Sequence, residues 1–169
     1  SDKWRMETEA YLRLFLAHVE SRYADRMLGY VLACGRTTEW IDYSNWHASP
    51  DKTEKWNAWR QAKGLEPAPV PSFERIRQAS FDNLIRDPSR EQDVLDYAAF
   101  SNEIVADAII RFAAKAREII PPGRKLGAFF GYVLQFWSRE LVSCGHLGYE
   151  RVFASPDLDF FVSPGNYAD

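Results

Sequence analysis

Three short apolar runs that alternate with helical patterns constrain the fold of this 169-residue chain more than any other feature. The runs span Met27–Ala33, Lys125–Leu134 and Leu158–Val162. Each is close to continuously apolar, which is typical of parallel strands buried on both faces. Helices that alternate with such strands indicate crossover connections and parallel pairing. We therefore predict an α/β fold, with about three parallel strands and flanking helices in a single domain over residues 1–169.

Helical patterns and helix-start signals fill most of the chain between these runs. The first segment places apolar residues at helical spacing, with charged residues on the opposite face. The longest helix is expected to begin at Asp87-Pro88-Ser89, a capping residue followed by proline, and to end before Pro121-Pro122-Gly123. Ser49-Pro50-Asp51 gives the same signal to a shorter helix that Gly64 ends. The predicted helical segments cover residues 5–23, 52–63, 72–85, 88–119 and 147–154.

The charge balance argues against polyanionic partners. Lysine and arginine total 21 against 24 aspartate and glutamate residues, a formal net charge of -3. Such a chain has no overall positive field that favours nucleic acid or an anionic membrane surface. Its apolar runs are all far shorter than the roughly 18 residues needed to span a bilayer. We therefore predict a soluble protein with no nucleic-acid or membrane partner.

The residues that bind metals and phosphates show no recognisable spacing. Cys34 and Cys144 have no second cysteine or histidine at ligand distance, and His18, His47 and His146 form no metal-binding motif. The chain also lacks a glycine-rich phosphate loop and a Gly-x-Ser-x-Gly nucleophile elbow. We expect neither a metal nor a cofactor.

A loop rich in aromatic and polar residues follows the first apolar run. It contains Glu39, Trp40, Asp42, Tyr43 and Trp46. Loops after the carboxyl ends of parallel strands form the binding crevice in α/β folds, so Glu39 stands where an active-site residue would stand. Its aromatic neighbours could stack against a ligand and raise the pKa of its carboxyl group by partial desolvation. The alternative is an ordinary glutamate in a solvated loop.

A glutamate with a raised pKa suits glycoside cleavage, which also requires a second carboxylate. Asp42 is too near in sequence to lie across a sugar ring from Glu39, and Asp159 precedes its strand, so we interpret Asp159 as structural. The pair Asn102-Glu103 resembles the pair that carries the acid in many retaining glycosidases. It falls within the longest predicted helix rather than after a strand, so we interpret it as part of a solvated helix face.

Three stretches together resemble one known family. They are Gly-Tyr-Val-Leu-Ala-Cys-Gly-Arg-Thr-Thr-Glu-Trp at residues 29–40, Gly-Ala-Phe-Phe-Gly-Tyr at 127–132, and the segment from Ser143-Cys144-Gly145-His146 through Ser155-Pro156-Asp157 to Ser163-Pro164-Gly165-Asn166-Tyr167. In this order and spacing the chain resembles part of the catalytic barrel of bacterial β-galactosidase-like glycoside hydrolases. The resemblance covers most of the chain from residue 27 on.

The resemblance implies a partial TIM-type (β/α)8 barrel in which Glu39 ends the fourth strand as the acid/base. Thr38 stands where this clan usually has asparagine, and the nucleophile of such enzymes follows the seventh strand, which this chain is expected not to reach. The implied function is a fragment of a retaining enzyme that hydrolyses β-glycosidic bonds, with little activity alone. The residues expected to bind the sugar are Trp40, Asp42, Tyr43, Trp46, Tyr132, Ser163 and Tyr167.

Other interpretations of the same residues remain open. The aromatic side chains could form the stacking surface of a carbohydrate-binding or scaffold module without catalysis. A small open-sheet enzyme of unrelated chemistry could use Asp42 and His146. For a partial barrel, cut strand edges favour pairing with a second copy or with the missing part of the barrel.

Overall fold

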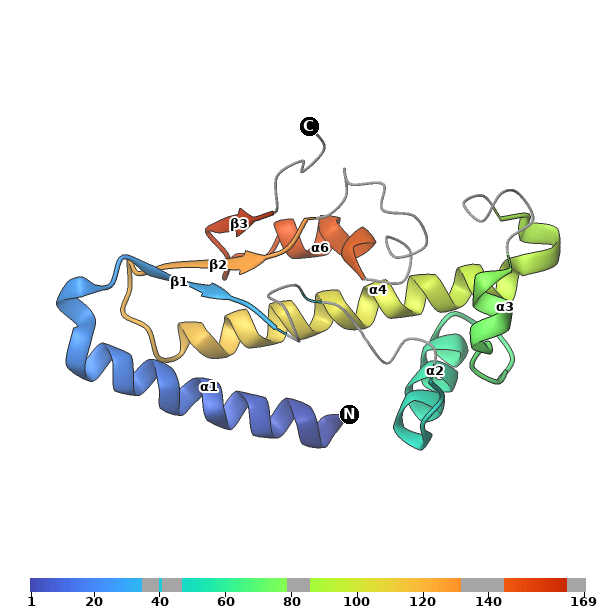
Figure 1. Ribbon diagram of the computed structural model, residues 1–169, viewed down its shortest axis with the longest axis horizontal. Coiled ribbons are helices and arrows are strands. Elements are labelled where there is room, and N and C mark those ends of the chain that lie inside the picture. Colours follow the sequence, from blue (N-terminus) through green and yellow to red (C-terminus); the bar gives the residue numbers. More distant parts are fainter. Residues whose placement is uncertain (35–39, 41–46, 79–85, 132–144, 164–169) are drawn as a thin grey trace.

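The computed structural model describes residues 1–34, 40, 47–78, 86–131 and 145–163 of the chain (Figure 1). Its fold is α/β, with a three-stranded sheet flanked by helices. All strands are parallel and lie in the order β1-β2-β3. The elements are α1 (Asp2–Tyr23), η1 (Ala24–Arg26), β1 (Gly29–Leu32), α2 (Pro50–Ala62), α3 (Phe73–Arg77), α4 (Pro88–Arg117), β2 (Lys125–Phe129), η2 (His146–Gly148), α6 (Tyr149–Phe153) and β3 (Phe160–Val162).

The helices α1, α2, α3 and α4 each begin at a residue whose side chain caps the helix. Ser1, Ser49, Ser72 and Asp87 each accept a hydrogen bond from a backbone N–H of the following turn. Such a cap satisfies one of the amides that a helix start leaves without an internal partner. The predicted starts after Ser49 and Asp87 are therefore confirmed. Because Ser1 caps α1, that helix begins before the predicted residue 5.

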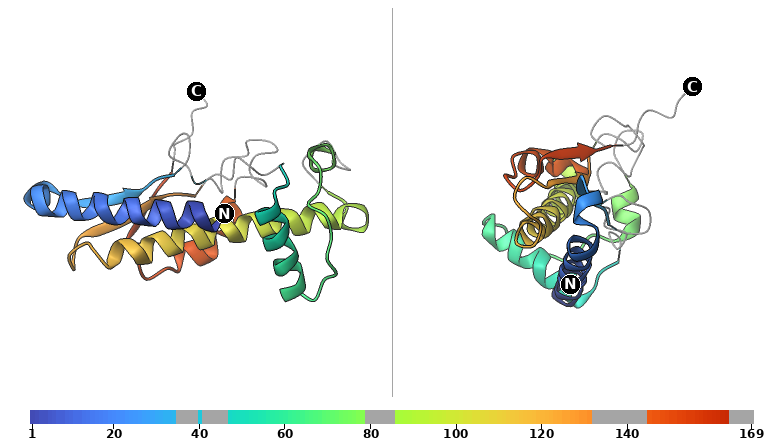
Figure 2. Two further views of the ribbon diagram at one scale, coloured as in Figure 1. Left: turned by 90° about the horizontal axis from the view of Figure 1, so that it is seen from below. Right: turned by 90° about the vertical axis from the view of Figure 1, so that its left-hand side faces the viewer.

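The flanking helices α1, α4 and α6 pack on one face of the sheet. Tyr30 and Leu32 of β1 pair with Leu126 and Ala128 of β2, and all four belong to the core that α1 and α4 complete. On the same face, the ring of Phe161 in β3 lies 4.5 Å from that of Phe153 in α6. Figure 2 shows α1 and α4 running side by side along this face.

The opposite face of β1 differs from the expectation of burial on both sides. Val31 points away from the helices and is 45% exposed, and no helix within the described residues covers this face. Gly127 lies beside Val31 in the register, and the Phe160 ring packs over Gly127 so closely that an added Cβ would lie 2.5 Å from it. The apolar run predicted the strand correctly, but among the described elements no helix covers the face on which Val31 lies.

Helix α4 joins two hydrophobic cores. Its carboxyl half contributes Ile109, Phe112 and Ala116 to the core beneath the sheet. Its amino half contributes Tyr97 and Phe100 to a second core around the fully buried Trp56 of α2. The buried stripe predicted for the longest helix is confirmed at Val94, Tyr97, Val105, Ala108, Ile109, Phe112 and Ala116, whereas Ala98, Ile104 and Ile119 are half-buried.

None of the helices in the described parts of the chain combines the length and apolar character needed to cross a bilayer.

Alanine substitutions at two glycines should separate backbone strain from steric overlap. Gly145 and Gly64 both have a positive φ, +84° and +73°, but a Cβ at Gly145 would overlap the Val105 side chain, whereas a Cβ at Gly64 would meet nothing within 4 Å. We expect Gly64→Ala to lower the free energy of unfolding by about 1–2 kcal/mol through strain alone. Gly145→Ala should cost about 1–3 kcal/mol more through overpacking. Urea denaturation of both variants measures the difference, and equal losses would contradict the close packing of Gly145 on α4.

Candidate functional site

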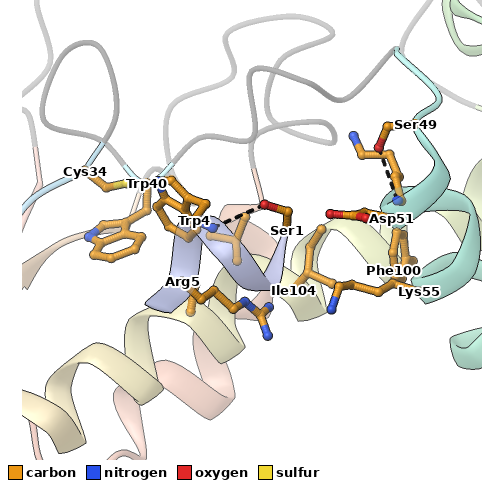
Figure 3. Close-up of a pocket in the computed structure, with 13 residues that line it drawn as sticks. Ser1, Trp4, Arg5, Cys34, Trp40, Ser49, Asp51, Lys55, Phe100 and Ile104 are labelled. Carbon is orange, nitrogen blue, oxygen red and sulfur yellow. Dashed lines mark hydrogen bonds between the residues drawn. The ribbon is translucent and has the colours of Figure 1, made fainter. Parts of the chain in front are cut away.

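A cavity of about 390 Å³ opens where β1 ends, between the first turns of α1 and α2 and the middle of α4 (Figure 3). Because it lies beyond the carboxyl end of a parallel strand, it occupies the position expected for a binding crevice in an α/β fold. The cavity is lined by Ser1, Trp4, Arg5, Cys34, Trp40, Ser49, Asp51, Lys52, Lys55, Phe100, Ile104, Val105 and Ala108.

Two tryptophans line one end of this cavity, and both contact Phe112 of the core. The indole Nε1 of Trp40 donates a hydrogen bond to the carbonyl oxygen of Leu32 at 3.1 Å, which fixes Trp40 against the end of β1. Its ring centroid lies 5.7 Å from that of Phe112 in α4. The ring of Trp4 meets the same Phe112 edge to face, with centroids 5.6 Å apart. Trp40 is only 5% exposed, whereas Trp4 is 41% exposed and offers the open aromatic surface.

Charged residues from the first two turns of α1 and α2 line another part of the cavity. Arg5, Lys52 and Lys55 are cationic, and Asp51 is anionic. The ammonium group of Lys55 donates a hydrogen bond to Asp2 at 2.6 Å and holds the pKa of that carboxyl group below its usual value. Arg5 also lowers the pKa of Asp2 through its charge. Asp2 therefore lies close to two cationic groups beside the cavity.

The structure describes two of the eight predicted site residues. Trp40 lines the cavity, although its burial makes it a wall against the core rather than an open stacking platform. Ser163 is exposed directly after β3, where its hydroxyl donates a hydrogen bond to the carbonyl oxygen of Gly131 at 3.3 Å. Both follow the carboxyl ends of parallel strands, and therefore lie at the same edge of the sheet. The predicted residues that lie outside the described part of the chain are Glu39, Asp42, Tyr43, Trp46, Tyr132 and Tyr167.

His146 has a structural position. It is completely buried, and its ring stacks on that of Phe130 with centroids 4.7 Å apart. Its Nδ1 accepts a hydrogen bond from the backbone N–H of Gly131 at 3.2 Å. His146 thus ties the end of β2 to η2. Full burial makes it a poor match for the alternative in which it acts on a ligand together with Asp42.

The Asn102-Glu103 pair also has a packing role. The side-chain oxygen of Asn102 accepts a hydrogen bond from the backbone N–H of Leu147 at 2.7 Å and holds η2 against α4. Glu103 accepts a hydrogen bond from the indole of Trp59 at 2.9 Å and forms an ion pair with Lys63 at 3.2 Å. Glu103 therefore joins α4 to α2, rather than lying on a purely solvated face as predicted. Neither residue follows a strand.

Asp159 is structural, as the sequence predicts. Its carboxylate accepts a hydrogen bond from the backbone N–H of Leu126 at 2.8 Å and pairs with Arg117 and Lys125. These interactions lower the pKa of Asp159 to about 2, chiefly because the Leu126 amide stabilises the charged form. Asp159 precedes β3 and so lies at the amino edge of the sheet, away from the cavity.

Of the described residues that line the cavity, sequence reasoning named Trp40 alone as a site residue. Among the residues it missed, Trp4, Arg5 and Lys55 lie near the starts of α1 and α2, and the periodic patterns that predicted those helices carry no information about which helix starts lie close together. Among the described residues, no group of three or more histidine, cysteine, aspartate or glutamate side chains could hold a metal ion.

No protein family, curated protein or solved structure matches this chain.

Proposed function

We propose that this chain is part of the (β/α)8 barrel of a retaining, β-galactosidase-like glycoside hydrolase, with Glu39 as the acid/base. The observation that carries the proposal is the cavity at the carboxyl end of β1, whose wall includes Trp40. Glu39 immediately precedes Trp40 in the sequence. Catalytic carboxylates of barrel enzymes come from the ends of strands at this edge, so the cavity supports a catalytic role for the segment after β1.

The arrangement of the sheet supports a barrel over an open, doubly wound sheet. Consecutive strands are neighbours in the order β1-β2-β3, and α1, α4 and α6 all lie on one face. A doubly wound sheet carries helices on both faces and reverses its strand order at a switch point. In a barrel the helices form an outer ring, and the other face of the sheet turns inward. The exposed Val31 would then belong to the barrel interior.

In the proposed mechanism, the carboxyl group of Glu39 protonates the glycosidic oxygen as the bond to the leaving group breaks. A second carboxylate, supplied by the parent protein outside this chain and held about 5–5.5 Å from the carboxyl group of Glu39, attacks the sugar carbon and forms a covalent intermediate. Glu39 then removes a proton from the water that hydrolyses this intermediate. To act as a general acid, the carboxyl group of Glu39 must carry a proton when the substrate binds.

The proposal predicts that the chain and its parent protein differ in activity on aryl β-glycosides. The 169-residue chain should bind sugar without measurable turnover, because the attacking carboxylate belongs to the parent. A longer parent protein that includes the remaining strands should hydrolyse the same substrates. Release of the aryl alcohol, followed by absorbance, measures both. Equal turnover by the two proteins would contradict the missing nucleophile, and no turnover by the parent would contradict the hydrolase.

A carbohydrate-binding module is the second candidate, and the exposure of Trp4 favours it. An indole that is 41% exposed at the mouth of a cavity can stack on a sugar ring without any catalytic carboxylate. In that case the parent protein should bind sugar and never release the aryl alcohol. The assay above therefore separates the two candidates.

A further inference from the structure

The cavity beyond β1 has an aromatic end and a charged end. Figure 3 shows Trp4, Trp40 and Cys34 at one end, Ser49, Asp51 and Lys55 at the other, and Arg5 with Ile104 between them. The apolar floor comes from α4. A ligand that fills this cavity would therefore place a ring or other apolar face against the indoles and a polar or charged group toward α2.

The charges around this cavity favour an anionic ligand. Among the residues that the structure describes, three cationic side chains line it against one carboxylate, that of Asp51, although the chain as a whole has a net charge of -3. Asp2, beside the cavity, is hydrogen-bonded to Lys55 and also lies near Arg5, so one carboxylate is shared by two cations. Within this described set, a positive surplus remains even when Asp2 is counted.

Arg5 is the cation best placed to bind such a group. It is half-buried in the cavity wall, and no ion pair or hydrogen bond joins its guanidinium group to another described side chain. A guanidinium group presents a planar set of donors that matches a carboxylate with two parallel hydrogen bonds. Partial burial would strengthen this contact relative to one in open solvent.

We propose that the cavity binds a sugar that bears a carboxylate, with its ring against Trp4 and its carboxylate at Arg5 and Lys55. This inference rests on the proposed carbohydrate function and names the substrate class of that site: an acidic glycoside such as a uronic acid residue, rather than a neutral hexose. The 390 Å³ of the cavity is in the range of small-ligand sites.

The test measures binding by the 169-residue chain through its tryptophan fluorescence. The ligands are methyl β-D-galacturonoside, the matched neutral methyl β-D-galactoside, and inorganic phosphate. We expect the galacturonoside to bind about tenfold more tightly than the galactoside at low salt, since one added charge-assisted contact gives a difference of this order. Raising the salt from about 20 to about 300 mM should weaken binding of the galacturonoside and leave that of the galactoside unchanged.

Two arginine variants give a matched comparison. Arg5→Gln should weaken binding of the galacturonoside about tenfold. Arg22→Gln removes the same charge from the exposed last turn of α1, far from the cavity, and should leave binding unchanged. Equal affinity for the acidic and neutral sugars, equal effects of the two variants, or phosphate binding as tight as that of the galacturonoside would each overturn the inference.

This test can be told apart from the test of the proposed hydrolase. It measures binding by the 169-residue chain, and binding does not depend on turnover. If the parent protein hydrolyses neutral galactosides and this chain does not prefer the galacturonoside, only the acidic ligand is rejected. If the chain prefers the galacturonoside through Arg5 and the parent shows no turnover on either sugar, only the hydrolase is rejected.

Discussion

Replacement of Glu39 with glutamine should slow hydrolysis of alkyl β-glycosides by the parent protein by about 10²- to 10⁴-fold under the proposed function. Glutamine keeps the size of the side chain but has no acidic proton to donate to the departing oxygen. The loss should depend on the leaving group, because a dinitrophenolate departs without protonation. The values of kcat/KM for an alkyl glycoside and for the dinitrophenyl glycoside measure this dependence, because kcat/KM reports cleavage of the glycosidic bond and not the later hydrolysis of the intermediate, which needs Glu39 with either substrate.

Glu103→Gln supplies the matched control for this experiment. Glu103 accepts a hydrogen bond from Trp59 and pairs with Lys63, and it belongs to the packing between α2 and α4. Its replacement should leave the rates on both substrates nearly unchanged. A Glu39→Gln variant that lowers kcat/KM equally for the alkyl and the dinitrophenyl glycoside, or one that is no slower than Glu103→Gln, would contradict the acid role of Glu39.

Phe112→Ala should lower the free energy of unfolding by about 3–5 kcal/mol, the range for truncation of a buried phenylalanine. The ring is 1% exposed and lies in the larger core. It also contacts Trp4 and Trp40, the two tryptophans of the cavity wall, so its removal should loosen both. Urea denaturation measures the stability, and a change in tryptophan emission at low urea reports the loosened wall.

Phe15→Ala is the control for this substitution. Phe15 lies in α1 and is 46% exposed, with its ring stacked on that of Tyr11. Its truncation removes the same atoms from a half-solvated site and should cost about 1 kcal/mol or less. If the two variants lose equal stability, Phe112 does not have the central position in the core described above.

The helices could be predicted from sequence because their signals are local. Ser49 followed by Pro50, and Asp87 followed by Pro88, specify helix starts through capping and a fixed φ angle, and both starts are found. The strands were placed correctly but predicted too long: the run Met27–Ala33 contains the four residues of β1. Strand ends depend on which neighbour continues the ladder, and this is a property of the whole fold.

Burial and the walls of the cavity could not be predicted in the same way. An apolar run does not say which of its faces the helices cover, so Val31 was expected to be buried. Trp40 was predicted as part of an open platform, but its contact with Phe112, far along the chain, buries it. Trp4, Arg5 and Lys55 line one cavity because the starts of α1 and α2 lie close together, which no local pattern encodes.

The sequential order of the strands has a consequence for how the chain assembles during synthesis. β2 and β3 each pair with the described strand that leaves the ribosome just before them, and the crossover from β1 to β2 contains α2, α3 and α4. Among the described strands, none has to insert between two that have already paired. This part of the sheet can therefore grow in one direction, from β1 toward β3, and the helices of each crossover can shield newly paired backbone before the next strand emerges.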